Sequence, residues 1–440
     1  MLYHILKFII SIGIRIYYKE IKVVGREHIP KKGPLIIAAN HPNTLMDAWM
    51  IGMICKQPIY YMTKATFFST RFKRRLLTSL KMVPINRAHE GRQEGVDNKA
   101  SFEACYQLLE NEKFLVIFPE GTSFKERVLR KLKSGTARIA LETENRNNFE
   151  LGVKIVTVGI NYAMPERFQS RILVSISEPF EVKDMKEKYA QNPTTASKEV
   201  TEKIRANLEK VLATTLDKEH DQITENLYDI LSIQDFKNLS RSKGVANRIS
   251  KVKEISNRLQ ELEVSEPWKV YEIKYLAKKI NFKLKKLHLK TMFVEKGIRK
   301  GRVIRELFWS MLLIILFFPL FIYGLFFNFV PYKLVDLLVP KISKDVEYFA
   351  PLAIILSGII YPIYYFGVVY AVVNIFDLIF FRGMIFMISL PISGIFAYTF
   401  KKNLDHVAYK WNYLFLLISR KDIVRALEKD IKQLKAYIFN

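Results

Sequence analysis

A histidine and an aspartate, His41 and Asp47, lie with five residues between them in the sequence LIIAANHPNTLMD, which covers residues 35–47. The apolar run 35–39 predicts a strand buried on both faces, and Thr44 followed by Asp47 has the spacing of a capping box that opens a helix. His41 is therefore expected in a turn between strand and helix. A carboxylate in the first helical turn can orient that imidazole, a side chain able to take a proton near neutral pH. The pair predicts general base chemistry.

A simple turn would account for the same residues. Asn40, Pro42 and Asn43 are common turn formers, and Asp47 would then only cap the helix. Histidine and aspartate lie close together in many proteins without a catalytic role, so the choice between these interpretations depends on the rest of the chain.

Basic residues follow two of the other apolar runs. Ligand sites in α/β sheets lie beyond the carboxyl ends of the strands, so such positions are candidates for substrate binding. Arg87 follows the run 82–85, and its guanidinium can hold a phosphate through two parallel hydrogen bonds. Lys64 follows the run 59–62 and is a second candidate for a phosphate contact. Together with the basic cluster at 71–75, Lys64 also fits a solvated or lipid-facing surface.

The apolar run 114–118 is followed by Glu120-Gly121-Thr122-Ser123. Glu120 can accept hydrogen bonds from hydroxyls or hold a cationic side chain, and Gly121 lets the backbone turn tightly beside a site. We expect these four residues to line a substrate pocket.

Short apolar runs alternate with helical stretches in the first part of the chain, which predicts an α/β domain over residues 24–185. Residues 1–23 carry basic residues on one helical face and predict an amphipathic helix in a membrane interface. The predicted strands of the domain are 35–39, 59–62, 82–85, 114–118, 153–160 and 172–176.

The second part of the chain is expected to be helical. Residues 186–300 predict a basic helical region, residues 301–400 a transmembrane region and residues 401–440 a basic amphipathic tail helix. An even number of crossings returns the tail to the cytoplasm, whereas three crossings leave it outside, and its basic residues favour the even number. The predicted spans are 307–330, 349–376 and, as a third span or an in-plane segment, 383–400.

A net charge of +26 on 440 residues indicates an anionic partner, which would be nucleic acid, a phospholipid surface or a phosphorylated substrate. The basic residues flank apolar segments and no nucleic-acid recognition motif is present, so we expect a phospholipid bilayer and no nucleic acid. Cys55 and Cys105 predict buried thiols in a reducing compartment. No metal is expected, because no cluster of His, Cys or Asp has ligand spacing.

Four sequence blocks occur in a fixed order. They are Asn40-His41-Pro42-Asn43 with Asp47, Val83-Pro84-Ile85-Asn86-Arg87, Phe118-Pro119-Glu120-Gly121-Thr122-Ser123, and residues 155–162 (IVTVGINY). In order and spacing they resemble the glycerolipid acyltransferase family, which comprises glycerol-3-phosphate and 1-acylglycerol-3-phosphate (lysophosphatidate) acyltransferases. The resemblance spans about residues 24–180. It implies an α/β acyltransferase domain with a mixed sheet flanked by helices.

The resemblance also implies an activity, in which a fatty acyl group moves from a thioester to a hydroxyl. His41 would be the general base, Asp47 its orienting carboxylate, Arg87 the phosphate ligand and residues 120–123 part of the acceptor pocket. Acyl-CoA or acyl-carrier protein would be the donor, with no other cofactor. The enzyme would be an integral membrane protein whose catalytic domain faces the cytoplasm, as at a bacterial inner membrane.

The chain departs from the family pattern at three points. Most members have four residues between the histidine and the aspartate, many have an arginine where Ser123 stands, and block four usually has a proline where Thr157 stands. Five intervening residues are similar to a branch that acylates glycerol-3-phosphate or dihydroxyacetone phosphate, which favours such an acceptor. A lysophosphatidate or other lysolipid acyltransferase stays open as an alternative, as does a non-catalytic lipid-binding membrane scaffold.

Replacing Arg87 with alanine is expected to raise the KM for a phosphorylated acceptor far more than the KM for the thioester donor, because Arg87 is predicted to bind the phosphate. Steady-state kinetics with each substrate varied in turn measure both constants. An acceptor KM equal to that of the parent protein would contradict the assignment.

Overall fold

The computed structural model describes residues 2–86, 98–231, 245–291, 294, 300–377 and 379–439. Arg87, the predicted phosphate ligand, lies outside the described residues. The chain divides into two compact units, each of which is described by itself. The first unit consists of Met1–Lys218, Ser242–Ser250 and Asp345–Ile354, and the remaining residues form the second.

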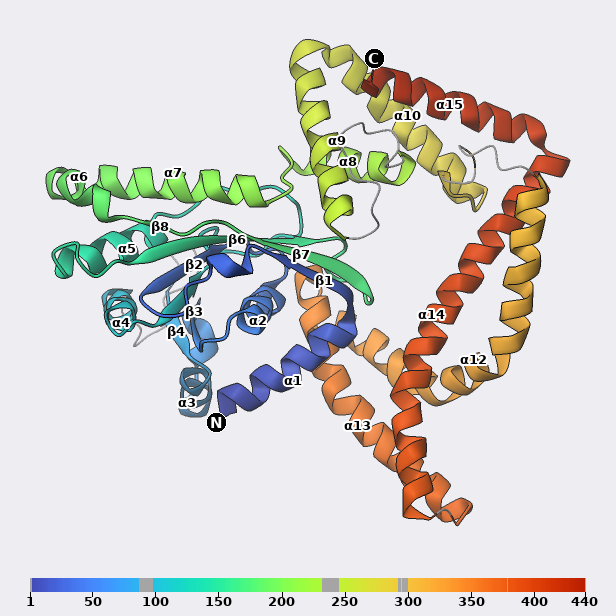
Figure 1. Ribbon diagram of the computed structural model, residues 1–440, viewed down its shortest axis with the longest axis horizontal. Helices are drawn as coiled ribbons and strands as arrows, with labels where there is room; N and C mark the ends of the chain where they lie inside the picture. Colours follow the sequence, from blue (N-terminus) through green and yellow to red (C-terminus); the bar gives the residue numbers. More distant parts are fainter. Residues whose placement is uncertain are drawn as a thin grey trace. The chain divides into compact units, whose positions relative to one another are not determined.

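The described residues of the first unit form an eight-stranded sheet in the order β1-β7-β6-β2-β5-β3-β4, with β8 paired to β6 (Figure 1). Strands β6, β2, β5, β3 and β4 are parallel to one another, whereas β7 is antiparallel to β6 and parallel to β1. The strands are β1 (Tyr18–Val24), β2 (Leu35–Ala39), β3 (Ile59–Lys64), β4 (Met82–Ile85), β5 (Phe114–Ile117), β6 (Lys154–Tyr162), β7 (Ser170–Ile176) and β8 (Phe180–Glu181). All six predicted strands are confirmed, and the carboxyl ends of the five parallel strands share one edge of the sheet.

The prediction for the beginning of the chain was wrong in one respect. Helix α1 (Leu2–Tyr17) ends before residue 23, and the next seven residues form the edge strand β1. Hydrogen bonds to β7 override the helical pattern there, so the α/β unit begins earlier than residue 24.

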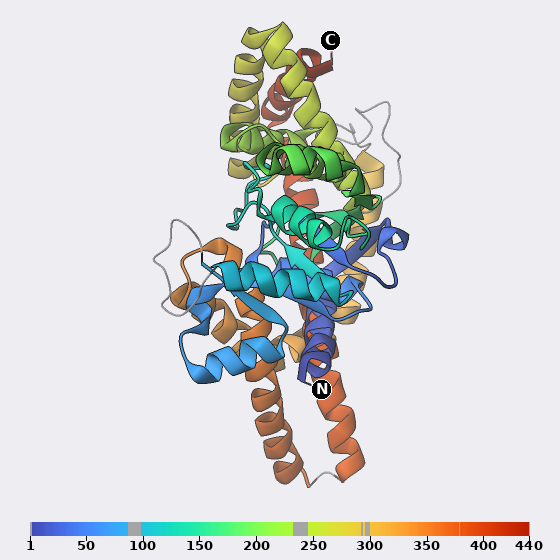
Figure 2. The same ribbon diagram turned by 90° about the vertical axis from the view of Figure 1, so that its left-hand side faces the viewer.

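Helices cover both faces of the sheet. On one face α1 and α2 (Thr44–Ile54) pack with the strands in a core that contains Ile14, Met50 and Ile51. The opposite face is covered by α4 (Asn98–Glu110), α5 (Gly135–Arg146) and α7 (Pro193–Val211), which lie side by side in both views (Figures 1 and 2). The other short helices of this unit are α3 (Arg71–Ser79), α6 (Lys186–Gln191), η1 (Arg26–His28), η2 (Ala65–Phe68) and η3 (Lys183–Met185).

The boundary predicted at residue 185 differs from the structure. Val200, Ile204 and Leu208 form the apolar stripe of α7, and all three are buried in the α/β core. The partner of this stripe is the α/β core, so the first unit continues beyond residue 185.

A segment from much later in the chain also belongs to the first unit. It contains η5 (Val346–Tyr348) and the first turns of α13 (Phe349–Ile375). Ala350 is fully buried in the core beside α1 and α2, and the Thr44 hydroxyl donates a hydrogen bond of 2.9 Å to the carbonyl oxygen of Glu347. This segment lies within residues 301–400, which were predicted as a transmembrane region, so the prediction does not hold for its part in the α/β core.

Both cysteines are buried free thiols, as predicted. Burial raises the pKa of Cys55 and of Cys105 to about 12, so neither thiol is a nucleophile at neutral pH.

The second unit is helical. Its helices are α8 (Lys218–Ile230), α9 (Val245–Ser265), α10 (Pro267–Lys286), α12 (Lys300–Ile342), α14 (Phe380–Ser419), α15 (Lys421–Phe439) and the later part of α13. Leu227, Leu259, Leu276 and Leu434 are among the buried residues that join α8, α9, α10 and α15 in one apolar core. Within the predicted tail 401–440, the separate amphipathic helix is α15 (Lys421–Phe439), whose apolar face is buried in this core, whereas residues 401–419 continue α14.

Three helices among the described residues are long and apolar enough to cross a bilayer: Ile304–Ile342, Val346–Ile375 and Phe380–Ser419. By this length and composition the chain is an integral membrane protein. The third helix has 40 residues, so the in-plane segment considered for 383–400 is part of a longer helix. Asn328 of α12 donates to the carbonyl of Leu390 on α14 and accepts a hydrogen bond from Tyr365 on α13. Such bonds hold apolar helices together in a bilayer.

The close approach of α7 to β6 gives a test of the first unit. A Cβ atom on Gly159 would lie 2.6 Å from the carbonyl oxygen of Val211, so Gly159→Ala forces the end of α7 away from the strand. Overpacking of this kind typically costs about 1–3 kcal/mol of unfolding free energy, and we expect a lower melting temperature. Gly301→Ala is the control, because nothing lies within 4 Å of its added methyl group. Equal melting temperatures for the two variants would contradict this packing.

Candidate active site

The turn after β2 is fixed to the neighbouring strand. The Asn40 side chain donates to the carbonyl oxygen of Ile160 at 3.1 Å and accepts the amide N–H of Ile160 at 2.7 Å. Both bonds link the carboxyl end of β2 to β6. The next residue, His41, therefore leaves the sheet from a defined position.

The predicted pair is in contact. The Nδ1 atom of His41 lies 2.9 Å from Oδ2 of Asp47, whose side chain is fully buried. Asp47 also accepts the amide N–H of Asn43 at 2.7 Å and the hydroxyl of Tyr162 at 2.8 Å. Three donors surround one buried carboxylate, which compensates for the loss of its hydration.

The helix start differs from the predicted capping box. Asn43, and not Thr44, precedes the first turn of α2, and Asp47 reaches back to the amide N–H of Asn43. Thr44 has a φ of +40°, which is rare for a β-branched residue, and its hydroxyl is engaged by Glu347. Strained residues of this kind cluster at functional sites.

The imidazole ring has a fixed orientation. Phe118, the residue after β5, stacks on it with ring centroids 3.9 Å apart and planes 11° apart. The His41 side chain is 13% exposed. When the Nδ1–H group is donated to Asp47, the lone pair of the ring is on Nε2, so this nitrogen is the one available to accept a proton.

Glu120 connects the two neighbouring loops. Its Oε1 atom accepts the amide N–H of His41 at 3.2 Å, and the carboxylate also accepts the amide N–H of Arg130. Burial raises the pKa of the Glu120 carboxyl, and these hydrogen bonds act in the opposite direction. Glu120 therefore ties the loop after β5 to the turn that carries the histidine.

The other predicted site residues are placed as follows. Gly121 adopts a φ of +79°, and the Lys133 side chain lies against it. Thr122 and Ser123 lie in the same loop and make no side-chain hydrogen bond to any residue that the structure describes. Lys64 ends β3 at the same edge of the sheet, but β5 separates β3 from β2, and Lys64 takes part in another interaction of the chain.

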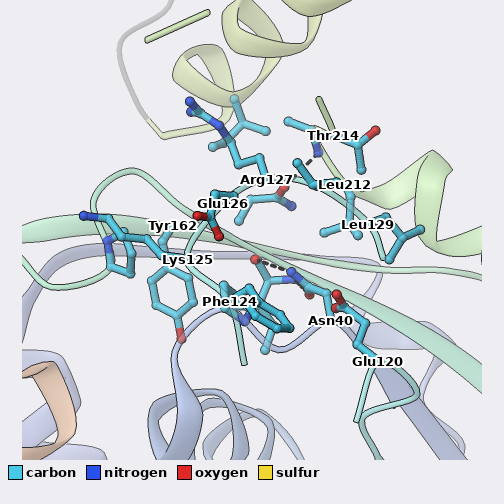
Figure 3. A pocket seen from close by; sticks show the side chains of 17 residues that line it. Asn40, Glu120, Phe124, Lys125, Glu126, Arg127, Leu129, Tyr162, Leu212 and Thr214 are labelled. Atoms are coloured by element: carbon cyan, nitrogen blue, oxygen red, sulfur yellow. Dashed lines mark hydrogen bonds between the residues drawn. The ribbon is translucent and has the colours of Figure 1, made fainter. Parts of the chain in front are cut away.

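A pocket lies next to the histidine turn. Asn40, Pro42 and Glu120 line it together with the loop after β5, the end of β6 and residues 212–214. Figure 3 shows Asn40 beside Glu120, with Lys125 on the opposite side of the pocket. His41 and Asp47 are not among the residues that line this pocket.

Two residues of the site were not assigned a role from the sequence. Tyr162 closes the fourth sequence block and Phe118 opens the third, so both were within quoted motifs. Their contacts with Asp47 and His41 join positions far apart in the chain, which block spacing does not reveal. In the part of the chain that is described, no group of three His, Cys, Asp or Glu side chains could hold a metal ion.

Comparison with known proteins gives matches for the same region. A family model described as "Acyltransferase" matches residues 20–161. Glycerol-3-phosphate O-acyltransferase 1 of Saccharomyces cerevisiae is 33% identical over 30% of this chain and 18% of the yeast protein. An uncharacterized acyltransferase of Schizosaccharomyces pombe is 20% identical over 40% of this chain and 38% of that protein. The chain thus matches less than two fifths of the length of either curated relative.

Among solved structures, the 1-acyl-sn-glycerophosphate (LPA) acyltransferase PlsC of Thermotoga maritima matches with a TM-score of 0.33 and 19% identity, covering 47% of this chain and 79% of that one. The matched family region, residues 20–161, contains His41, Asp47 and Glu120 in the geometry described above. Over residues 20–161 this chain is therefore similar to the acyltransferase family that the model describes.

Proposed function

We propose that this protein is a membrane-bound O-acyltransferase that moves a fatty acyl group from a thioester to a hydroxyl of glycerol-3-phosphate or dihydroxyacetone phosphate. The observation that carries the proposal is the hydrogen bond between His41 Nδ1 and the buried Asp47. A lipid-binding surface without catalysis has no need of a buried carboxylate with three donors or of a histidine held by it.

In the proposed reaction Nε2 of His41 takes the proton of the acceptor hydroxyl as its oxygen attacks the thioester carbonyl. The tetrahedral intermediate collapses, the carbon–sulfur bond breaks, and the imidazolium returns the proton to the departing thiolate. Asp47 fixes the ring nitrogen that carries the hydrogen and stabilises the imidazolium. A thioester is already activated, so no covalent enzyme intermediate is required.

The acceptor is proposed on two grounds. The five-residue separation of His41 and Asp47 is similar to the branch that acylates glycerol-3-phosphate or dihydroxyacetone phosphate, and the S. cerevisiae relative is named for the first of these acceptors. In this proposal Arg87 binds the acceptor phosphate, while Glu120 and the pocket beside it shape the space for the glycerol part. Either acyl-CoA or acyl-carrier protein supplies the acyl group.

The membrane position is part of the proposal. Beyond the three apolar helices, α1 presents an exposed apolar face opposite the side that packs on the sheet, which suits a helix lying in a bilayer interface. The exposed residues of this face are Leu2, Ile5, Phe8, Ile9, Ile12 and Ile16. The catalytic domain then works on the cytoplasmic face, where the thioester donors are found.

Purified protein incubated with acyl-CoA and glycerol-3-phosphate is expected to form lysophosphatidate, identified by its mass. His41→Ala should lower the turnover about 100- to 10,000-fold, because it removes the general base. His288→Ala, at an exposed position in the second unit, is the matched control and should keep full turnover. Near-normal turnover in the His41 variant would exclude the mechanism, and product formation only with lysophosphatidate as acceptor would exclude the proposed substrate.

The hydroxyl of Tyr162 gives a second test. Tyr162→Phe removes one of the three donors to Asp47, and a hydrogen bond to a charged group is worth about 1.5–3 kcal/mol, so kcat should fall by up to about 100-fold. Tyr18→Phe is the control, because the Tyr18 hydroxyl bonds Pro165 and Asn43 and does not contact Asp47. Stopped-flow or steady-state kinetics compare the two. An equal loss in both variants would mean that the tyrosines act only through stability.

A further inference from the structure

Helix α3 lies on the surface of the first unit, and none of its residues is buried. Phe72 in its first turn is 75% exposed, and Phe67 in the preceding helix η2 is 48% exposed. An aromatic ring in water forgoes the free energy that it would gain in an apolar environment. These two rings, which lie five positions apart, form an apolar patch that no described residue covers.

The charges around this patch all have one sign. Four exposed cations lie within positions 71–75, namely Arg71, Lys73, Arg74 and Arg75. No aspartate or glutamate occurs in the sequence from residue 48 to residue 89. Lys73 donates to the hydroxyl of Ser69, whereas the three arginine side chains form no ion pair or hydrogen bond with any residue that the structure describes. The protein itself therefore supplies no anion to these arginines.

The cations lie at the end of α3 where positive charge is least favourable. The hydroxyl of Thr70 accepts the amide N–H of Lys73 at 3.2 Å, so the helix begins at Arg71. The N-terminus of a helix carries a partial positive charge, which favours acidic side chains there. The first turn of α3 has none, and like charges one turn apart repel one another. Anions from outside the protein would relieve both costs.

Helix α3 lies near the part of the first unit that is attached to the membrane region. Figures 1 and 2 both place α3 beside the first turns of α1. The Tyr3 hydroxyl of α1 accepts the amide N–H of Ile59 at 3.1 Å, which ties α1 to the strand that precedes η2. A Cβ atom on Gly13 of α1 would lie 2.9 Å from Ile354, where the chain leaves the first unit within a helix apolar enough to cross a bilayer. The bilayer surface therefore lies close to α1 and, next to it, α3.

We infer that η2 and α3 form a docking surface for anionic phospholipids, with Phe67 and Phe72 in the bilayer interface and the cations of positions 71–75 on the lipid phosphate groups. The inference rests on the membrane position proposed for α1 and extends it to a second helix and to a class of lipid. Basic side chains beside exposed aromatic rings are typical of helices that lie on an anionic membrane surface. Contact through both α1 and α3 would fix the orientation of the catalytic unit on the bilayer.

The test places a fluorescent label beside the patch. Both native thiols are buried, so the full-length protein with Ser69→Cys can be labelled at that exposed position alone, with both phenylalanines kept. The labelled protein is reconstituted in vesicles of phosphatidylcholine, either alone or mixed with phosphatidylglycerol. We expect the emission to shift to shorter wavelength when phosphatidylglycerol is present, and lipids brominated in their acyl chains to quench it. Lys198→Cys, at an exposed position of α7 on the face of the sheet opposite to α1, is the control and should report water in both vesicles.

Removing the charges should release the label. Each basic side chain at an anionic surface changes the binding equilibrium about fivefold, so glutamine at positions 71, 74 and 75 together should lower the ratio of lipid-bound to free label about 100-fold. Added salt should weaken the shift in the parent protein, because it screens the same charges. The matched control removes three exposed lysines of η3, α6 and α7 and should leave the label unchanged: Lys183→Gln, Lys186→Gln and Lys198→Gln. A thermal melt of each variant checks the fold, and Phe72→Ser tests the apolar contact without a change of charge.

A label on Phe8→Cys, in the exposed apolar face of α1, separates this inference from the proposed membrane position. If the label at Phe8 enters the bilayer and the label at Ser69 stays in water in both vesicles, α3 is a solvated surface and the inference alone is overturned. If both labels stay in water, the proposed membrane position fails as well. An emission shift at Ser69 that occurs in detergent without anionic lipid and grows with protein concentration would mean that a second copy covers α3, which also overturns the inference.

Discussion

A single buried carboxylate determines much of the first unit. Asp47 is completely removed from solvent, and a charge in that position is tolerated only when donors replace the lost water. Two of its donors, His41 and Asn43, come from the turn after β2, and the third, Tyr162, comes from the end of β6. The sheet must therefore bring the ends of these two parallel strands together, and the paired hydrogen bonds between Asn40 and Ile160 do so.

The sequence alone was sufficient to predict the parts of the structure that a local pattern determines. The run 35–39 is uniformly apolar because β2 lies between β5 and β6 with helices on both faces, so it was identified as a buried strand. The contact of His41 with Asp47 was also predictable, since a turn and the first turn of a helix keep them close. Glu120 was placed at the correct edge of the sheet because parallel strands end there together.

Contacts between strands and side chains that are far apart in the chain could not be predicted from local sequence patterns. The strand β1 was missed because its residues continue the basic and apolar pattern of α1, and only hydrogen bonds to β7 select the extended conformation. Tyr162 and Phe118 were within recognised blocks, but their partners depend on the order of strands in the sheet. The closeness of Lys133 to Gly121 could not be predicted from the sequence either, because it depends on the path of the loop between them.

Asp345–Ile354 belongs to the first unit, so the folding of the catalytic unit depends on a segment from the apolar part of the chain. The bond from Thr44 to Glu347 spans 303 positions, and Ala350 is fully enclosed by the core of α1 and α2. A truncated version that ends after α7 would be missing part of its own interior and would leave a strained threonine beside the histidine without support. A soluble fragment that lacks the apolar helices is therefore unsuited to the study of this protein. The purified protein has to keep these helices, in detergent, so that the catalytic site stays intact.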